Sequence, residues 1–139
     1  MTYDPAANKI NYVERYVPNP DPALKKVLGW SKFEYDLKGN LHVAENSERK
    51  RVVIVYDSRD RIKTMVDQDK RQISFEYDES SKPVKITDST LGFVTVEYAN
   101  SGEIKNVKSP AGRKVQTKVM ATYNGLIAII QPTAVPLTF

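Results

Sequence analysis

The chain of 139 residues contains no cysteine, which excludes disulfide bonds, thiolate zinc sites and cysteine nucleophiles. Its single histidine, His42, excludes a His-rich metal site and gives no support to a histidine-dependent catalytic triad. The six glycines are dispersed one at a time, so there is no glycine-rich phosphate loop. No apolar run approaches the roughly 18 residues of a membrane-spanning helix, and the N-terminus lacks the basic and apolar regions of a signal peptide. These absences predict either a cytoplasmic protein or a segment of a larger chain.

The charged residues do not gather into a patch of one sign. The chain has 21 basic and 17 acidic residues, a net charge of +4 and a pI near 9.2. The charges interleave along residues 57–63, and the densest basic run, 49–51, follows Glu48 directly. This pattern is typical of solvated strands and turns, so we do not expect nucleic acid to be a partner. The length and the apolar fraction of 40% predict one domain over residues 1–139.

What the sequence does contain is a repeat of 21 residues. The repeat is marked by tyrosines at Tyr35, Tyr56, Tyr77 and Tyr98. Two positions earlier stand Phe33, Ile54, Phe75 and Val96. Aspartate follows three of the four tyrosines, as Asp36, Asp57 and Asp78, and turn-forming residues stand four positions after them, as Gly39, Asp60, Ser81 and Gly102. The phased return of these residue types indicates a structural repeat.

The segments before the tyrosines alternate with a period of two, which predicts β-strands. Val52, Ile54 and Tyr56 alternate with residues of the other face, and the segments before Tyr77 and Tyr98 do the same. Each repeat therefore predicts a strand, a tight turn, a shorter strand and a second turn. The predicted fold class is all-β, an antiparallel meander of hairpin repeats that forms a twisted, curved sheet. We expect the aspartates to cap the first turn and the glycines to supply its left-handed conformation.

Both ends of the array depart from the regular repeats at 33–109. A degenerate N-terminal unit at 1–32 contains Asp21, Pro22 and Gly29 at the positions of a helix N-cap, first turn and C-terminus, which predicts an inserted short helix near 22–28. The C-terminal part, 110–139, predicts a hairpin and a tail. The hairpin consists of a strand at 114–122, a turn at 123–125 and an apolar strand at 126–130. Because residues 121–139 carry no charge, we expect them either to mediate self-association or to pack against the concave face of the sheet.

The repeats resemble those of the YD-repeat (Rhs-type) family. The stretch 35–41 matches the family's order of Tyr-Asp, turn glycine and basic-aliphatic pair nearly completely, whereas 56–62 and 77–83 have Asp60 and Ser81 in place of the glycine. The resemblance implies a short array or fragment of a larger bacterial protein, secreted or on the cell surface, whose hairpins form a spiralling shell or an extended surface. Some members have been described as carbohydrate-binding. The family's self-cleaving Asp-Pro-x-Gly-Leu motif is absent, so self-cleavage is not implied here.

The aromatic ladder admits two interpretations. The ladder consists of Tyr35, Tyr56, Tyr77, Tyr98, Phe33 and Phe75. It forms either the packed face of the sheet or an exposed platform on which sugars or bases stack. The recurring aspartates are interpreted as turn caps rather than as calcium ligands or an acid–base pair, because equivalent positions lie about 9.5 Å apart, two strands away. We predict no catalytic residue, metal or cofactor.

The sequence thus predicts a non-enzymatic structural or interaction module of an exported YD-repeat protein, which contributes to a shell or an extracellular contact surface. The alternative is a carbohydrate-binding module that uses the aromatic ladder, with a glycan as its partner. Under the first hypothesis the partners are other segments of a larger YD-repeat chain or a second copy of this one.

Overall fold

The computed structural model describes residues 2–4 and 9–130 as one antiparallel sheet with a C-terminal helix. The ten strands follow one another in chain order across the sheet, so the predicted meander is confirmed. The strands are β1 (Thr2–Asp4), β2 (Lys9–Val17), β3 (Lys26–Tyr35), β4 (Leu41–Asn46), β5 (Arg51–Tyr56), β6 (Ile62–Asp67), β7 (Gln72–Tyr77), β8 (Pro83–Asp88), β9 (Gly92–Tyr98) and β10 (Ile104–Lys108). The expected tail beyond residue 130 lies outside the described residues.

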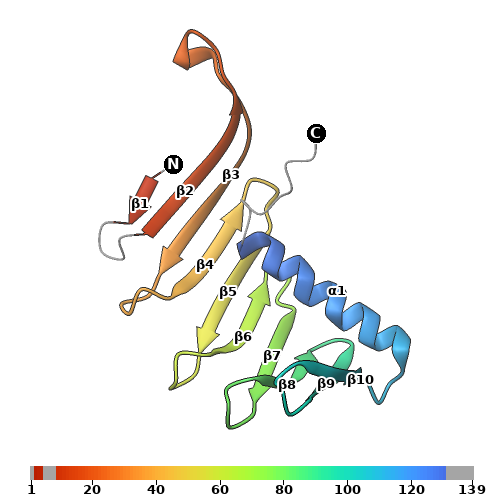
Figure 1. Ribbon diagram of the computed structural model, residues 1–139. Helices are drawn as coiled ribbons and strands as arrows, with labels where there is room; N and C mark the ends of the chain where they lie inside the picture. The colour runs from red at the N-terminus through yellow and green to blue at the C-terminus, as the bar shows by residue number, and fades with distance from the viewer. Residues whose placement is uncertain (1, 5–8, 131–139) are drawn as a thin grey trace.

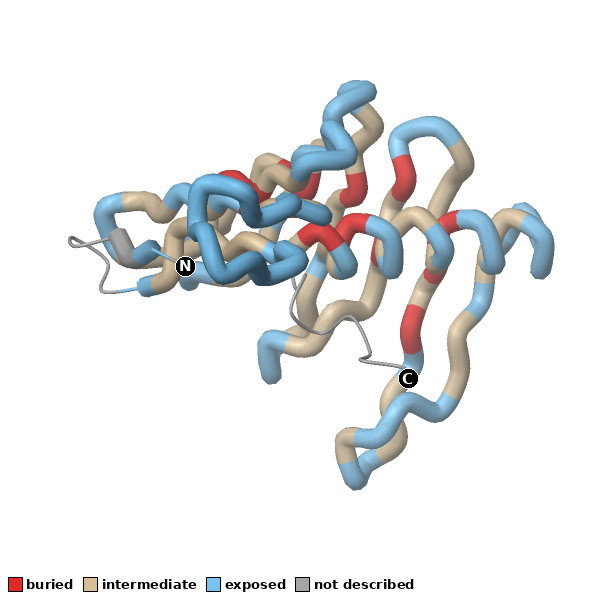
Figure 2. Tube along the Cα trace, turned by 90° about the horizontal axis from the view of Figure 1, so that it is seen from above, coloured by how far each residue is buried: buried red, intermediate tan, exposed pale blue. Residues whose placement is uncertain are grey.

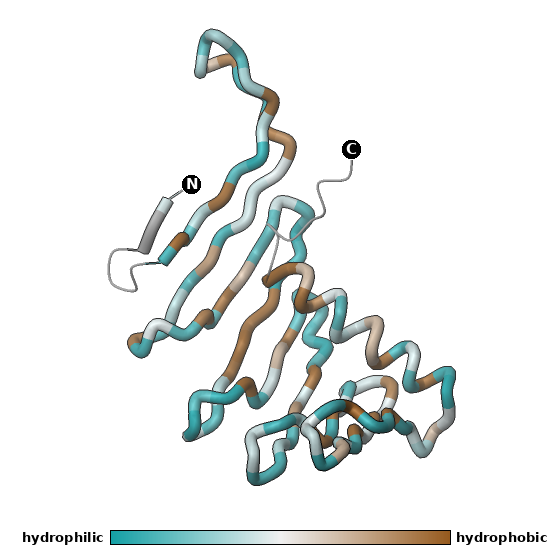
Figure 3. Tube along the Cα trace, viewed as in Figure 1, coloured by the Kyte–Doolittle hydropathy of each residue, from teal (hydrophilic) through white to brown (hydrophobic). Residues whose placement is uncertain are grey.

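The helix α1 (Arg113–Ile130) crosses one face of the twisted sheet, which we call the inner face (Figure 1). It packs against β9, β8, β5 and β4. The buried core consists of Ala44, Val52, Ile54, Met65, Ile73, Ile86 and Val94 of the sheet with Val119, Leu126 and Ile129 of α1. Buried positions are drawn red in Figure 2, and the apolar stretches of β5 and the end of α1 stand out in Figure 3. Burying one such side chain contributes roughly 1.5–3 kcal/mol, so the core depends on α1 as well as on the strands.

The hairpin predicted at 114–130 is wrong, because this segment is helical. Its apolar residues also recur at helical spacing, with Val115, Val119, Tyr123 and Leu126 on the side that faces the sheet. Gly125, expected in a turn, lies inside α1. A strand could not cover several neighbouring strands at once, whereas a helix laid across them buries their inner side chains. The apolar segment up to residue 130 is therefore covered by the chain's own sheet.

The helix predicted near 22–28 is reduced to one 3-10 turn, Pro22–Leu24, at the end of a long hairpin. Asp21 caps this turn as expected, since its carboxylate accepts a hydrogen bond from the Ala23 amide at 3.0 Å. The residues that follow belong to β3, where Val27 pairs with Tyr16 of β2. A seven-residue helix without a packing partner is unstable, so the backbone pairing between β2 and β3 is more favourable than a helix here. The insertion therefore lengthens β2 and β3, whose hairpin projects beyond its neighbours (Figure 1).

The first turn is capped as predicted in the three repeats in which aspartate follows the tyrosine. The carboxylate of Asp57 accepts hydrogen bonds from the amides of Arg59 and Arg61 at 2.8 and 3.0 Å, and Asp36 and Asp78 cap their own turns in the same way. Gly39 and Gly102 have φ of 83° and 90°. This is a type I turn followed by a left-handed residue, a common hairpin connection.

The second turn of the repeat uses the same design, which sequence reasoning did not specify. Asp67 accepts hydrogen bonds from the amides of Asp69 and Arg71, both at 2.9 Å, and Asn46 does so in the preceding repeat. The left-handed positions here are filled by Lys70 (φ 68°) and Arg49 (φ 64°). A residue with a side chain pays a conformational cost at such an angle.

We expect the Lys70→Gly variant to be more stable than the wild type. The left-handed conformation costs an L-residue about 1 kcal/mol, and the greater freedom of glycine in the unfolded chain offsets part of the gain, which leaves about 0.5 kcal/mol. Urea denaturation measures the difference. Gly39→Ala is the matched control and should lose about 1 kcal/mol. A lower unfolding midpoint for Lys70→Gly would contradict the turn geometry.

One carboxylate of the array is fully buried. The side chain of Asp88 has 0% exposure and forms an ion pair with the guanidinium of Arg71 at 2.9 Å. It also accepts hydrogen bonds from the amide and hydroxyl of Thr90, both at 2.9 Å. Burial alone would raise the pKa of Asp88, but the hydrogen bonds from Thr90 and Arg71 outweigh it and hold the pKa below its ordinary value.

The contribution of Asp88 to the free energy of unfolding should therefore decrease as the pH becomes acidic. Because its folded-state pKa is depressed, the stabilisation is present above the unfolded pKa of about 4 and is lost as the pH falls through the folded pKa. Asp88→Asn should cost about 2 kcal/mol at pH 7, the scale of hydrogen bonds to a charged group. Denaturation of both proteins from pH 7 down to pH 2 should show the difference shrinking; a difference that stayed constant would refute this account.

Candidate functional site

The tyrosine ladder joins each hairpin to the one before it. Each of the four tyrosines donates its phenol hydrogen to a main-chain carbonyl of the preceding hairpin. The pairs are Tyr35 with Ile10 at 2.6 Å, Tyr56 with Leu41 at 2.7 Å, Tyr98 with Pro83 at 2.6 Å, and Tyr77 with Ile62. In the junctions formed by Tyr56, Tyr77 and Tyr98, the residue that supplies the carbonyl stands six positions after the previous ladder tyrosine. The phenol is thus part of the sheet's hydrogen bonding.

A cation covers three of the four tyrosine rings. Arg61 lies 4.6 Å from the centroid of the Tyr77 ring, Lys82 lies 5.2 Å from that of Tyr98, and Lys9 lies 5.5 Å from that of Tyr35. Arg61 and Lys82 stand five residues after the previous tyrosine, directly before the carbonyl acceptor. We call this position the clamp position, and in the junction of Tyr56 it is filled by Asn40. Cation–π contacts of this kind contribute roughly 0.5–1 kcal/mol each at exposed sites.

The clamp residue also reaches the turn of the following hairpin. Its partner in every case is the left-handed residue four positions after the next tyrosine. Lys9 donates to the Gly39 carbonyl at 2.7 Å, Asn40 to the Asp60 carboxylate at 3.4 Å, Arg61 to the Ser81 hydroxyl at 3.3 Å and Lys82 to the Gly102 carbonyl at 3.2 Å. Each junction therefore has a phenol hydrogen bond and a contact from the clamp residue to the first turn of the next hairpin, and three of the four also have a cation over the tyrosine ring.

The surroundings of the phenols favour their neutral form. Burial raises the pKa of Tyr56 and Tyr98 above the ordinary value, and the negative charge of the aspartate in the preceding first turn, Asp36 and Asp78 respectively, raises it further. Burial and Asp57 raise the pKa of Tyr77 in the same way, although the charge of Arg61 acts against the rise. The phenols of Tyr56, Tyr77 and Tyr98 remain hydrogen-bond donors at neutral pH.

The two phenylalanines of the ladder belong to the packed face. Phe33 and Phe75 are partly buried and lie against the core. The ring of Phe75 stacks on Tyr77 with centroids 6.4 Å apart and forms a T-shaped pair with Tyr123 of α1 with centroids 5.9 Å apart. The chain's own groups thus occupy the ring faces that a sugar would need, which favours the packed interpretation. The carbohydrate-binding alternative remains a prediction.

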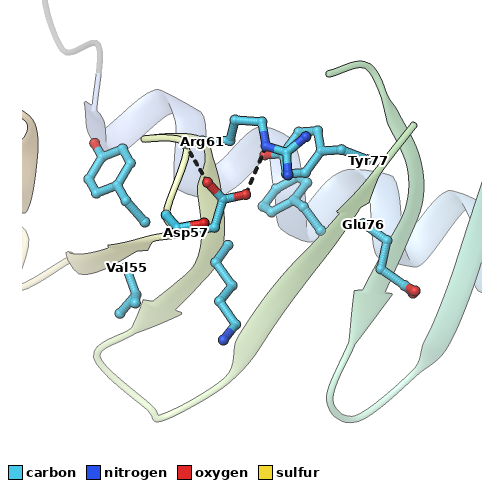
Figure 4. Close-up of a pocket in the computed structure, with 9 residues that line it drawn as sticks. Val55, Asp57, Arg61, Glu76 and Tyr77 are labelled. Atoms are coloured by element: carbon cyan, nitrogen blue, oxygen red, sulfur yellow. Dashed lines mark hydrogen bonds and ion pairs between the residues drawn. The ribbon is translucent and has the colours of Figure 1, made fainter. Parts of the chain in front are cut away.

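A shallow depression lies beside the junction between the β5–β6 hairpin and β7 (Figure 4). Its volume is about 620 Å³. Val55, Lys63 and Glu76 line it together with the ion pair of Asp57 and Arg61, whose nitrogen and oxygen atoms are 2.8 Å apart. Burial alone would raise the pKa of Asp57, but the hydrogen bonds from Arg61 and Arg59 lower it overall, so that it stays ionised.

The described part of the chain holds no group of three or more histidine, aspartate or glutamate side chains placed to bind a metal ion. Among the described residues, no helix combines the length and the apolar character required to cross a membrane. The aspartates after the tyrosines are occupied as turn caps.

The clamp position is the feature that sequence reasoning missed. In the sequence, Arg61 and Lys82 are recognisable as the basic half of a basic-aliphatic pair. The tyrosines that they cover, Tyr77 and Tyr98 respectively, belong to the next hairpin and lie 16 residues further along the chain. The signal that could have found them is their fixed spacing both from the previous tyrosine and from the next one. Lys9 shows that the degenerate first unit keeps the same joint.

We expect Tyr98→Phe to lose about 1 kcal/mol of unfolding free energy, the typical net value of one hydrogen bond. The variant keeps the ring and its contact with Lys82, and it leaves the Pro83 carbonyl without the phenol. Thermal and urea unfolding measure the loss. Tyr16→Phe, at a tyrosine that is 48% exposed, is the control and should change stability by less than about 0.5 kcal/mol. Equal effects of the two variants would rule out a structural role for the phenol.

Comparison with protein families finds a match to the family described as Teneurin YD-shell over residues 9–136. Comparison with curated proteins finds no match. The family match covers nearly the whole chain and agrees with the tyrosine–aspartate repeats and with the hairpin sheet that they form. The chain therefore belongs to the Teneurin YD-shell family, a YD-repeat family, and is a structural module of the shell type.

Proposed function

We propose that this chain is a non-enzymatic wall segment of an exported YD-repeat protein and presents its outer face as an extracellular contact surface. The observation that carries the proposal is the joint between hairpins, in which the same phenol-to-carbonyl hydrogen bond recurs four times. A repeated joint makes a uniform sheet, which suits a wall better than a single specialised site.

The joint supports this role because it stiffens the sheet where backbone pairing is weakest. Between β4 and β5 only the pairs from Val43–Val53 to Glu45–Arg51 are formed, so the strands separate toward the far end. The Tyr56 phenol fills that opening and bonds the Leu41 carbonyl. Four such bonds, at about 1 kcal/mol each, resist the hinge motion that would otherwise open the wall between neighbouring hairpins.

The outer face has the character of a solvated surface. Lys85 and Glu76 form a cross-strand ion pair at 3.7 Å, and Lys108 and Glu97 form another at 3.6 Å. Their side chains are between 37% and 66% exposed, so these pairs contribute little to stability. They give the face mixed charge, which suits contact with water and with a polar partner.

Glycan binding is the second candidate, and the depression beside Arg61 and Tyr77 is the observation that favours it. Val55 offers an apolar wall and Lys63 and Glu76 offer polar groups, a combination that suits a sugar ring with its hydroxyls. Figure 4 shows Glu76 and Val55 on the two sides of the depression.

A glycan array and native-state hydrogen exchange together test these two functions. As a wall, the wild-type chain should retain no glycan, and the amides of β4 to β9 should exchange through one cooperative opening. Specific binding that is lost in Lys63→Ala and kept in the control Lys105→Ala would replace the wall with the glycan-binding module. Independent opening of single hairpins would also contradict the wall.

A further inference from the structure

We propose that the edge of β10 that pairs with no other described strand is an acceptor for a tyrosine-bearing strand of another YD-repeat segment, and that Glu103 selects a partner whose turn carries a cation. The inference rests on the proposed wall function and adds to it the chemistry of the partner.

β10 has the same form as the strands that accept a tyrosine inside the sheet. The acceptor strands β4, β6 and β8 each carry a register shift opposite the preceding tyrosine strand, and β10 has the same shift between Ile104 and Asn106. Ile104 stands six residues after Tyr98, which is the position of the acceptors Leu41, Ile62 and Pro83. Ile104 is 63% exposed, so this acceptor position faces solvent.

The turn that would lead into a further strand beside β10 is present, but a helix follows it. At the end of β10, the Gly112 amide bonds the Ser109 carbonyl at 3.0 Å, and Gly112 has φ of 98°. This repeats the second turn at Asp67–Lys70, after which the next tyrosine strand begins. Here α1 begins instead and crosses the inner face to β4. Within residues 2–4 and 9–130, β10 has one strand neighbour, β9.

The clamp position at this edge has the opposite charge. Glu103 stands where Arg61 and Lys82 stand in the internal joints, and it is exposed. Each internal clamp residue contacts the left-handed turn residue of the next hairpin, so an incoming hairpin would place its equivalent residue beside Glu103. A carboxylate at this point attracts a lysine or arginine. An ion pair of this kind already exists inside the sheet. Asp60, the left-handed turn residue of one hairpin, pairs with Lys38 in the first turn of the preceding hairpin at 3.2 Å.

The edge strand β10 also carries residues that disfavour non-specific pairing with other strands. Lys105 and Lys108 lie on β10, and lysines on an edge strand disfavour association with other strands. An incoming strand must therefore offset their desolvation. A tyrosine that reaches Ile104 and a cation that reaches Glu103 supply two specific contacts for this purpose.

A peptide with the sequence of residues 72–82 and the change Ser81→Lys provides the partner in its simplest form, since it contains a tyrosine strand and its turn. We would titrate it into the full chain and follow the amide signals and the hydrogen exchange of residues 104–108 by NMR. We expect protection of these amides. The peptide with the further change Tyr77→Phe should bind about fivefold more weakly, the equivalent of one hydrogen bond of about 1 kcal/mol.

A charge exchange tests the selectivity. In the chain variant Glu103→Lys, the Ser81→Lys peptide should bind several-fold more weakly, and a Ser81→Glu peptide should bind more tightly than it does to the wild type, with both effects reduced by salt. The control is the chain variant Glu79→Lys, in which the same charge change is made in another turn and peptide binding at β10 should be unchanged.

The outcomes separate the inference from the wall function. Protection of β10 that is insensitive to residue 103 and to the tyrosine overturns the proposed selectivity and leaves the wall function intact. An unchanged β10 edge at millimolar peptide, or shifts confined to β4, β5 and α1, overturns the acceptor site itself. Loss of the internal cooperative opening would instead count against the wall function, whatever the peptide does.

Discussion

The hydrogen bond from each ladder tyrosine to a carbonyl of the preceding hairpin is the interaction on which the arrangement of the hairpins depends. Backbone pairing alone holds neighbouring repeats together over a short stretch, as between residues 64–66 of β6 and 72–74 of β7. Beyond it the strands separate, and a side chain of fixed length must close the opening. A phenol does this because its ring fills the apolar space while its hydroxyl satisfies a carbonyl.

This requirement explains why the repeat could be predicted from the sequence and why its joints could not. The tyrosine spacing, the alternation of apolar residues and the Asp turn caps are local signals, and they predicted the meander and its first turns. The role of Arg61 depends on which carbonyl and which turn the register brings beside Tyr77, and that register includes an irregularity in the partner strand. No pattern within one hairpin contains this information.

The C-terminal segment shows how two valid periods can compete. Residues 113–130 contain many β-branched residues and an Asn124-Gly125 pair, which favour a hairpin, and their apolar residues also fit a helical stripe. The choice is made by the inner face of the sheet, where Ile54, Met65 and Ile73 need cover from an element that spans several strands. Tertiary packing therefore overrides the local preference, as it also does at the N-terminal insertion, where strand pairing replaces the expected helix.

The joints are uniform in geometry but not in chemistry. The phenol and its carbonyl acceptor are present at all four, whereas the clamp position is filled by lysine, asparagine, arginine and lysine in turn. No cation from the described part of the chain lies over the Tyr56 ring, and Asn40 holds this joint through hydrogen bonding alone, which shows that the sheet can close with only the hydrogen-bonding parts of the clamp. The side chain at this position is therefore free to vary without loss of the fold. A position that is geometrically fixed and chemically free can distinguish one neighbouring segment from another, and at the edge of the sheet that position is Glu103.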